Sequence, residues 1–235
     1  MTSNELIQVE GLEVRRGKFT LAVQEWRLPP GEVVGLVGPN GAGKTTFLER
    51  LAGLRGDSSG SVSVFGRDPW RDSTVREELG FMSDDMPLFT MRIGALLRML
   101  SGYYRTWDAT LAETLLERFK LDPREKVHSL SKGQGTRLRL ITAMAFRPRV
   151  LLLDEPATGL DVGGRRALLE SVLNVVRDPQ RSVVISSHML GDVERVADRL
   201  LVLDGGRIVK EGRTDGLVGE KRTLEEALLD WGAGG

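Results

Sequence analysis

The chain opens with short segments in which apolar and polar residues alternate. Such segments occupy residues 5–37, and Gly11, Gly17 and the Pro-Pro-Gly run at 29–31 separate them. Alternation with a period of two predicts strands that bury one face, and glycine or proline between them predicts turns. This part of the sequence therefore predicts antiparallel strands that lead to a buried strand over 32–37.

A different period follows between residues 93 and 146, where apolar residues recur every three or four positions. This spacing predicts amphipathic helices inserted into a strand-rich chain. Continuous apolar runs then return at 150–153, 182–187 and 200–203, with helical patterns between them. Runs without alternation are typical of strands buried on both faces, and their alternation with helices predicts a mostly parallel sheet. A last helix is expected over 223–231.

The junction between the first strands and the first helix carries the most specific motif. It follows the pattern Gly, four residues, Gly, Lys, then Ser or Thr, and its residues are Gly38, Pro39, Asn40, Gly41, Ala42, Gly43, Lys44, Thr45 and Thr46. Glycines let consecutive backbone N–H groups point at one anion. Lys44 offers a positive charge to the outer phosphates, and Thr45 offers a hydroxyl to Mg²⁺. Because a buried strand precedes this loop and a helix follows it, the sequence predicts binding of a nucleoside triphosphate.

Two adjacent acids end the buried run at 150–153. Asp154 is expected to hold magnesium through water beside the phosphate loop, and Glu155 to polarise an attacking water as a general base. A solvated strand terminus is the plain alternative, but the apolar run and the upstream loop favour the catalytic interpretation. His188 follows the run at 182–187. It is a candidate to bind the γ-phosphate or to hold the water and Glu155 in line, and otherwise a structural histidine.

Charge and composition narrow the class of protein. Lysine plus arginine number 33 and aspartate plus glutamate number 33, so nothing in the net charge favours nucleic acid or an anionic membrane. The absence of cysteine excludes disulfides, thiol catalysis and cysteine metal sites. The first residues lack the apolar stretch of a signal peptide, and no run approaches the roughly 20 apolar residues of a transmembrane helix. We therefore expect a cytoplasmic protein, with any membrane spans supplied by another polypeptide.

A third motif, Leu-Ser-Lys-Gly-Gln at 130–134, resembles the LSGGQ signature of ATP-binding-cassette (ABC) ATPases. The other motifs follow the order of that family. The loop at 38–46 resembles its Walker A motif, 150–155 its Walker B strand, 158–161 its D-loop, and His188 its switch histidine. Five motifs in the right order, over nearly the whole chain, make this resemblance highly specific.

The resemblance implies an α/β fold of the P-loop NTPase (RecA-like) type. Its mostly parallel sheet is joined by an N-terminal antiparallel β region and interrupted by a helical subdomain. A single ABC ATPase domain is then expected over residues 1–235, with the nucleotide-binding core at 1–85 and 147–222, the helical subdomain at 86–146, and a C-terminal helix and tail at 223–235.

The resemblance also implies a mechanism in which two copies face each other head to tail and enclose two ATP molecules. Ser131, Gly133, Gln134 and Asp161 are then expected to contact the ATP of the opposite subunit, where hydroxyl and N–H groups at a helix start meet the γ-phosphate. One chain carries one copy of each motif and needs a second subunit, most simply itself. ATP closes this homodimer and hydrolysis releases it, and the motion drives an attached permease.

Two positions depart from the family pattern. Asp84 stands where the family usually has a glutamine near magnesium and water, so it is a candidate magnesium ligand together with Thr45 and Asp154. Arg16 stands where the family stacks an aromatic residue on adenine. A guanidinium can stack on a base, Phe19 is the nearest aromatic alternative, and a solvated turn is the plain interpretation of Arg16. The base selectivity therefore stays open between ATP and GTP.

The resemblance extends to stand-alone ATP-binding subunits of bacterial exporters, which lie on the inner face of the cell membrane through a separate permease. The methionine-rich stretch at 86–99 is equally well explained as helical core or, through Met86, Leu88, Phe89 and Met91, as a groove for a permease helix. Two alternatives to transport are a soluble ABC ATPase that acts on ribosomes or DNA and a regulatory ABC subunit. The first usually joins two cassettes or carries coiled-coil or basic insertions, which this chain lacks.

Overall fold

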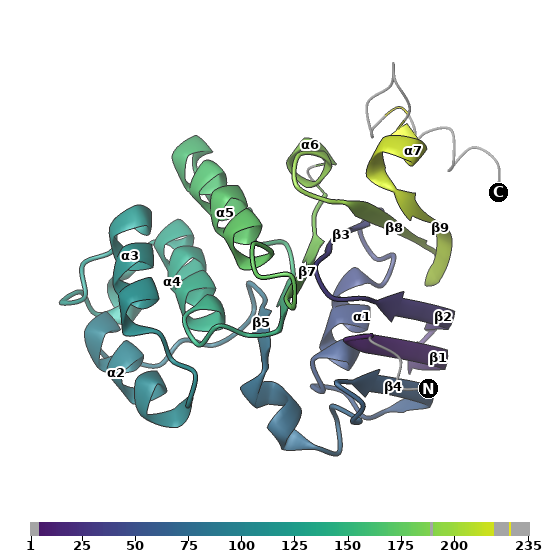
Figure 1. The fold of residues 1–235 in the computed structure, drawn as a ribbon, viewed down its shortest axis with the longest axis horizontal. Helices are drawn as coiled ribbons and strands as arrows, with labels where there is room; N and C mark the ends of the chain where they lie inside the picture. The colour runs from purple at the N-terminus through teal and green to yellow at the C-terminus, as the bar shows by residue number, and fades with distance from the viewer. Residues whose placement is uncertain (1–4, 189, 219–225, 227–235) are drawn as a thin grey trace.

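The structure of the chain is a computed structural model that describes residues 5–188, 190–218 and 226. The helix expected at 223–231 lies, apart from Glu226, outside the described residues. The described residues form one nine-stranded sheet in the order β4-β1-β2-β9-β8-β3-β7-β6-β5, with helices packed against it (Figure 1). The strands are β1 (Ile7–Arg16), β2 (Phe19–Leu28), β3 (Val33–Val37), β4 (Ser58–Val64), β5 (Leu79–Met82), β6 (Val150–Leu153), β7 (Ser182–Ser186), β8 (Arg199–Asp204) and β9 (Arg207–Arg213).

Five neighbouring strands, from β8 to β5, form the parallel part of the sheet. Every residue of β3, β6 and β7 is buried, as their continuous apolar runs predict. In parallel strands the carboxyl ends meet at one edge of the sheet. The phosphate loop after β3, the acidic pair after β6 and His188 after β7 therefore come to the same edge.

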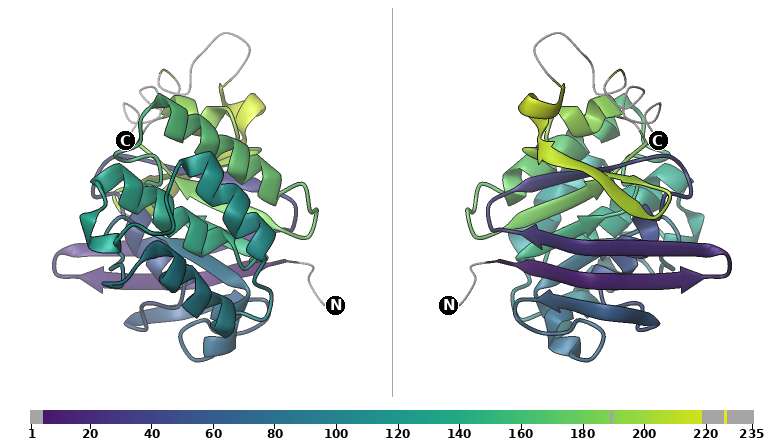
Figure 2. Two further views of the ribbon diagram at one scale, coloured as in Figure 1. Left: turned by 90° about the vertical axis from the view of Figure 1, so that its left-hand side faces the viewer. Right: turned by 90° about the vertical axis from the view of Figure 1, so that its right-hand side faces the viewer.

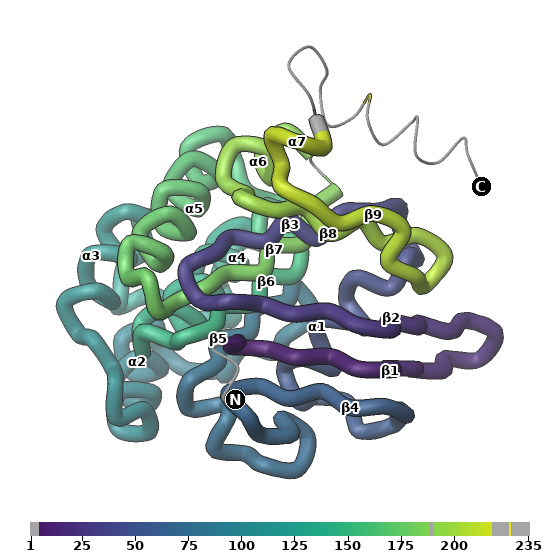
Figure 3. The backbone as a smooth tube through the Cα atoms, turned by 45° about the vertical axis from the view of Figure 1, so that its right-hand side comes forward, coloured from purple at the N-terminus to yellow at the C-terminus, as the bar shows by residue number. Residues whose placement is uncertain are grey.

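The antiparallel part consists of β1, β2 and β4, which run side by side in the tube of Figure 3. It joins the rest of the sheet where β2 pairs with β9 at Ala22 and Arg207. Two short segments that the sequence separates at Gly11 form one strand, β1. Gly11 has a left-handed φ of 57° and the register with β4 shifts between Glu10 and Glu13, so this glycine forms a bulge rather than a turn.

Seven α-helices surround the sheet in the described part of the chain. They are α1 (Lys44–Leu51), α2 (Ile93–Tyr103), α3 (Ala109–Phe119), α4 (Lys132–Met144), α5 (Val162–Val175), α6 (Leu190–Glu194) and α7 (Thr214–Val218). Helix α1 packs against the antiparallel strands, where the rings of Trp26 and Phe47 meet edge to face at 5.4 Å. Helices α4, α5 and α6 contribute to the buried cluster on the other face. None of the described helices is both long and apolar enough to cross a membrane.

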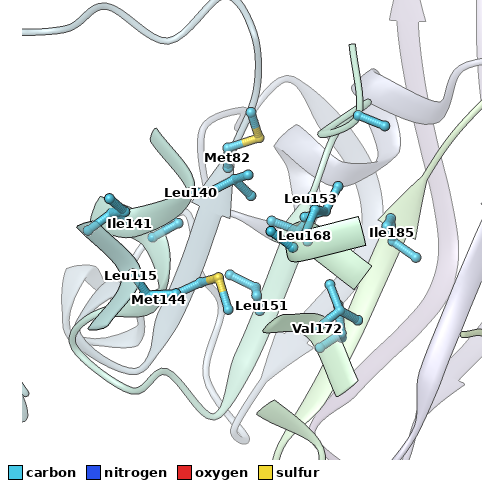
Figure 4. Packing of buried hydrophobic residues seen from close by; sticks show 14 of the residues in the cluster. Met82, Leu115, Leu140, Ile141, Met144, Leu151, Leu153, Leu168, Val172 and Ile185 are labelled. Carbon is cyan, nitrogen blue, oxygen red and sulfur yellow. The ribbon is translucent and has the colours of Figure 1, made fainter. Parts of the chain in front are cut away.

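Helices α2, α3 and α4 gather at one end of the molecule, the expected helical insertion (Figures 1 and 2). Their core is continuous with that of the sheet. In Figure 4, Leu140, Ile141 and Met144 of α4 lie in one buried cluster with Met82 of β5 and Leu151 of β6. The C-terminal half of α4 therefore anchors the helical region to the parallel strands by apolar contact. The expected α/β fold with a mostly parallel sheet is confirmed.

Candidate nucleotide-binding and catalytic site

The phosphate loop follows β3 and depends on glycine for its path. Gly38 has φ 150°, and a Cβ there would lie 2.0 Å from the carbonyl oxygen of Leu203. Gly43 has φ 108°, and a Cβ there would lie 2.9 Å from Cζ of Phe19. A side chain at Gly38 would require a shift of the β8 backbone, and at Gly43 the positive φ favours glycine over every other residue type. The loop is thus fixed by the β8 backbone on one side and by Phe19 on the other.

Lys44, the first residue of α1, folds back over this loop. Its ammonium donates to the carbonyl oxygens of Gly38 at 2.7 Å and Pro39 at 3.3 Å. The side chain is only 7% exposed. Burial lowers the pKa of Lys44, and the nearby carboxylates of Glu155 and Asp154 partly offset this. A buried ammonium that faces backbone carbonyls is well suited to exchange them for the oxygens of a phosphate.

A chain of short hydrogen bonds joins α1 to the ends of β6 and β7. The hydroxyl of Thr45 donates to Oδ2 of Asp154 at 2.7 Å, and the hydroxyl of Ser186 donates to Oδ1 of Asp154 at 2.7 Å. The backbone N–H of Glu155 donates in turn to Oγ of Ser186 at 2.9 Å. Sequence reasoning missed Ser186 as a site residue. The signal was a hydroxyl at the end of an apolar strand, where a buried polar group requires a partner.

Glu155 and His188 face each other across the ends of β6 and β7. Nδ1 of His188 lies 2.6 Å from Oε2 of Glu155, and the backbone N–H of His188 donates to the same oxygen at 3.3 Å. The other carboxylate oxygen lies 3.9 Å from Nζ of Lys44. Glu155 has a left-handed φ of 49°, a strained conformation that is common at functional sites. The structure thus brings together the two residues predicted to be catalytic.

A cavity of about 510 Å³ opens beside the phosphate loop. Its lining comprises Arg16, Phe19, residues 40–46 and Glu155. Both candidates for base stacking therefore lie at the cavity, Arg16 exposed and Phe19 half-buried beneath Gly43. Among the residues that the structure describes, none from the 130–134 motif lines this cavity. One copy of the chain thus presents the phosphate loop and the signature motif at separate places.

The signature motif begins helix α4. Ser131 is the N-cap, and its Oγ accepts from the backbone N–H of Gln134 at 3.3 Å while the Gln134 side chain accepts from the N–H of Ser131 at 2.9 Å. This capping box provides acceptors for the backbone N–H groups of Ser131 and Gln134. A Cβ at Gly133 would lie 2.6 Å from the carbonyl oxygen of Gly159. The signature and the D-loop are therefore packed backbone to backbone.

Asp161 lies in the D-loop and caps helix α5. Its carboxylate accepts from the backbone N–H of Gly164 at 2.8 Å and from the Arg137 guanidinium at 2.5 Å. The Gly164 hydrogen bond, with Arg137 next, holds the pKa of Asp161 below its usual range. Arg137 belongs to α4, so this contact ties the signature helix to the D-loop.

Asp84 follows β5 and faces helix α4. Its carboxylate lies 2.8 Å from Nζ of Lys132 and 3.8 Å from Nη1 of Arg139. No hydrogen bond or ion pair found among the described residues joins Asp84 to Thr45 or Asp154. Its role as a magnesium ligand stays a prediction.

A second, apolar cavity of about 150 Å³ lies between the segment after β5 and helices α2 and α4. Met86, Leu88 and Phe89 contribute to its lining, and Phe89 is 56% exposed. Met91 instead packs against the main buried cluster, as does part of Leu88. The two interpretations of this stretch thus apply to different residues: Met86 and Phe89 border a groove, and Met91 belongs to the core.

Comparison with known sequences places this site among related proteins. A family model described as ABC transporter matches residues 21–158. The Nod factor export ATP-binding protein I of Rhizobium etli is 33% identical over 211 residues, which cover 86% of this chain and 66% of that protein. The daunorubicin resistance ATP-binding protein DrrA3 of Streptomyces coeruleorubidus is 36% identical over 222 residues, which cover 91% and 70%. The chain thus spans about two thirds of the length of these relatives.

Solved structures share the fold at lower identity. An ATP-binding subunit of an ABC transporter superposes with a TM-score of 0.86 and 24% identity, covering 97% of this chain and 99% of that chain. A dimeric ATP-binding cassette in a post-hydrolysis state, bound to ADP and Pi, gives a TM-score of 0.76 and 20% identity, covering 88% and 98%. The sheet with its helical insertion is therefore a fold already known with nucleotide bound.

Proposed function

The chain belongs to the ABC transporter family, and from this premise we propose that it hydrolyses ATP to drive a separate membrane permease, as an exporter subunit. One observation carries the proposal. Lys44 and Thr45 of a phosphate loop, the acids Asp154 and Glu155, and His188 meet at one edge of the sheet with contacts of 2.6–3.9 Å. The relatives named for export support the direction of transport.

Each of these residues has a task in phosphoryl transfer. Lys44 binds the outer phosphates of ATP. Glu155 accepts the proton of the attacking water, and His188 holds that carboxylate in place through the 2.6 Å contact with Nδ1. The positive electrostatic field of Lys44 and of the start of α1 stabilises the charge that develops on the γ-phosphoryl group.

The donor set after β3 and β6 suits Mg²⁺. Thr45 Oγ1 and Asp154 Oδ2 are oxygen ligands of the type this ion prefers, and they lie 2.7 Å apart. When bound, Mg²⁺ neutralises charge on the phosphates. We assign Thr45 and Asp154 to it, directly or through water. Asp84, the third residue in the predicted set, has a carboxylate that two cations of α4 already face.

The separation of the two motifs supports a head-to-tail homodimer. Since the signature residues do not line the cavity of their own chain in the described structure, a second copy has to supply them. Ser131, Gly133 and Gln134, with Asp161 beside them, then complete the site of the partner. ATP between the two copies is the contact that closes the dimer, and its hydrolysis reopens it.

Size in solution tests the core of this proposal. Glu155→Gln keeps the shape of the side chain but removes the general base, so turnover should fall by about 10²–10⁴-fold. With ATP and magnesium the variant should double in mass, while the parent protein stays monomeric on average. A variant that binds ATP but remains monomeric would contradict the homodimer.

The nucleotide base is read by Arg16 in this proposal, because Phe19 is occupied in packing beneath Gly43. A guanidinium plane stacks on any base, so both ATP and GTP should bind. Arg16→Ala should weaken the affinity for both nucleotides about equally. If Arg16→Ala leaves the affinity unchanged while Phe19→Ala lowers it, the phenyl ring is the stacking group.

A cytoplasmic helix of the permease is the proposed occupant of the groove bordered by Met86 and Phe89. An exposed phenyl ring and a thioether next to an apolar cavity fit an amphipathic helix. Phe89→Glu should abolish co-purification with the permease and spare the ATPase activity of the isolated subunit. The matched control is Met99→Glu, which changes an exposed apolar residue on α2 and should leave the complex intact.

A further inference from the structure

One of the two departures from the family pattern, Asp84, contacts the lysine of the signature motif. Asp84 replaces the usual glutamine, and Lys132 occupies the third position of the signature, where LSGGQ has glycine. Oδ2 of Asp84 and Nζ of Lys132 lie 2.8 Å apart. The hydroxyl of the fully buried Thr136 lies 3.5 Å from Oδ1 of Asp84, and Arg139 lies at 3.8 Å. Positions 132, 136 and 139 share one face of α4, so this face surrounds the aspartate.

The two cations around Asp84 differ in their freedom to move. The Arg139 side chain is 17% exposed, and its Nε donates to the carbonyl oxygen of Met86 at 2.8 Å, so it is fixed to the loop after Asp84. The Lys132 side chain is 63% exposed. Of the two, Lys132 is the cation that is able to leave, and Arg139 then still faces the carboxylate.

The stem of Lys132 runs along the D-loop. A Cβ at Gly159 would lie 3.5 Å from Cγ of Lys132, and the neighbouring residues Ser131 and Gly133 begin the signature helix. The ammonium is therefore tethered within one side-chain length of the two residues assigned to the γ-phosphate. Lysine suits this place because its charge sits on a flexible four-carbon stem.

We infer that Lys132 is a further γ-phosphate-binding residue of the ATP sandwich, and that Asp84 is a positioning residue that holds the lysine until the phosphate replaces it. The inference rests on the proposed function, since the phosphate belongs to the ATP of the second copy. A triphosphate carries more negative charge than one carboxylate, so the exchange favours the closed dimer. Asp84 thereby sets how much ATP is needed for closure.

The exchange is tested in the Glu155→Gln background by the ATP concentration that gives half-maximal dimer. Removal of a charge-assisted hydrogen bond to phosphate should raise this concentration about tenfold in Lys132→Gln. Lys132→Arg should restore most of the loss, because it retains the cation. Asp84→Asn should lower the required ATP about threefold, the size expected for a partly exposed ion pair.

Two matched variants control for the loss of charge alone. Asp85→Asn removes the same charge one residue further along the chain, and Lys120→Gln removes an exposed lysine at the end of α3. Both should leave the ATP requirement within about twofold of the reference, as is usual for surface substitutions. Thermal unfolding without nucleotide should be similar for all variants, which separates a binding effect from a folding defect.

The double variant Asp84→Asn with Lys132→Gln decides between explanations. If Asp84 acts by holding Lys132, the benefit of Asp84→Asn disappears once the lysine is gone. If that benefit persists, Asp84 acts by repelling ATP on its own and the inference is wrong. A higher magnesium requirement in Asp84→Asn would also overturn it, since the carboxylate would then be a metal ligand.

The remaining outcomes separate this inference from the proposed function. If the reference protein dimerises and Lys132→Gln needs the same ATP concentration for half-maximal dimer, the ATP sandwich is supported. The role of Lys132 is then overturned. If the Glu155→Gln reference never dimerises with ATP, the homodimer itself fails and the inference fails with it. In the hydrolysing protein, Lys132→Gln should raise KM more than it lowers kcat. The increase in KM relative to the parent protein should shrink at high salt.

Discussion

Helix α1 begins at the phosphate loop and helix α4 at the signature-like motif, and the two helix starts are capped in opposite ways. Gly43 precedes α1 in a left-handed conformation, and no side chain caps the helix. Lys44 covers the loop by bonding to its carbonyls. At α4, Ser131 and Gln134 form a capping box, so side chains of the chain itself accept from two backbone N–H groups at the helix start.

The difference shows which half of the site depends on its ligand. Uncapped N–H groups at the start of α1 need an anion or water, so bound nucleotide completes this helix and stabilises the core. Helix α4 carries its own side-chain cap and is attached to the core by apolar contacts at its C-terminal half and by ion pairs at its N-terminal half. Its N-terminal end is therefore held in place by contacts within the chain, of which the ion pairs are exchangeable.

The substitution with the largest expected effect removes the Lys44 ammonium at the start of α1. Lys44→Met should weaken ATP binding by about 100-fold or more, because a charge-assisted contact to phosphate is lost. Calorimetric titration measures this directly. The thermal stabilisation that ATP gives to the parent protein should vanish in the variant.

The same variant has a pH signature without nucleotide. Burial lowers the pKa of Lys44, so the folded state disfavours the ammonium relative to the unfolded state. This penalty is fully present below the folded pKa and is relieved as pH rises through it towards the ordinary value of 10.5. As pH rises through the alkaline range, the Tm of the parent should therefore increase relative to the Tm of Lys44→Met. A constant difference across that range would show that burial of the ammonium carries no penalty.

The substitution with the next largest expected effect disrupts the packing of α4 against the D-loop. Gly133→Ala places a Cβ 2.6 Å from the carbonyl oxygen of Gly159, so the backbone must shift. We expect a loss of about 1–3 kcal/mol in the free energy of unfolding and a lower rate of ATP hydrolysis. Urea unfolding and steady-state turnover measure the two effects.

Gly163→Ala is the matched control for that substitution. Gly163 is also the second residue of a helix, α5, but no atom lies within 4 Å of the place that a Cβ would take there. Alanine there should increase the free energy of unfolding by roughly 0.5–1 kcal/mol through helix propensity. A decrease in the free energy of unfolding in Gly133→Ala and an increase in Gly163→Ala would support the close approach at Gly133. An increase in the free energy of unfolding in both variants would mean that the D-loop moves aside freely.

Much of the fold was predictable because its signals are local. The buried strands β3, β6 and β7 are continuous apolar runs, and the phosphate loop is one contiguous motif. Strand β9 gave no such signal, since most of its residues are exposed and it is defined by pairing with β8. The bulge at Gly11 was predicted as a turn, because a glycine in a strand gives the same local pattern for both.

Most residues of the candidate site have a signal in the sequence, but their contacts do not. Sequence reasoning identified Asp154, Glu155 and His188 from their positions at strand ends. The Ser186 contact with Asp154 joins residues 32 positions apart through the pairing of β6 and β7, and the Lys132 contact with Asp84 joins residues 48 positions apart through the packing of α4 beside β5. Such contacts depend on tertiary packing, which local periodicity does not encode.

A smaller effect distinguishes the cap of α4 from an ordinary cap. Ser131→Ala should lower the free energy of unfolding by about 1 kcal/mol, the usual value for a lost N-cap, and should also lower turnover. Asp108 caps α3 through the N–H of Leu111 at 2.8 Å, away from the phosphate loop. Asp108→Ala should lower stability by at least as much, because the contact with the Arg147 guanidinium is lost as well, and should leave turnover unchanged. Equal turnover in both variants would mean that the Ser131 hydroxyl serves α4 only as a cap.

The smallest effect concerns the charge that ties α4 to α5. The pKa of Asp161 is held down by the N–H of Gly164 and by Arg137, so the carboxylate stabilises the folded state above its ordinary value of 3.8. This contribution is lost as pH falls through the lowered folded pKa. Asp161→Asn keeps a capping side chain without the charge, and its Tm should be slightly below that of the parent at pH 7. The difference should shrink as pH falls below about 4 and disappear once the folded carboxylate, with its lowered pKa, is protonated.

A difference in Tm that stays constant down to about pH 2 would mean that the amide fails as a cap and that the ion pair with Arg137 contributes nothing. Of the two acids that pair with cations of α4, Asp161 and Asp84, only Asp84 would then hold the N-terminal end of this helix to the core. In that case the exchange of Lys132 between Asp84 and phosphate would by itself control the movement of the signature helix.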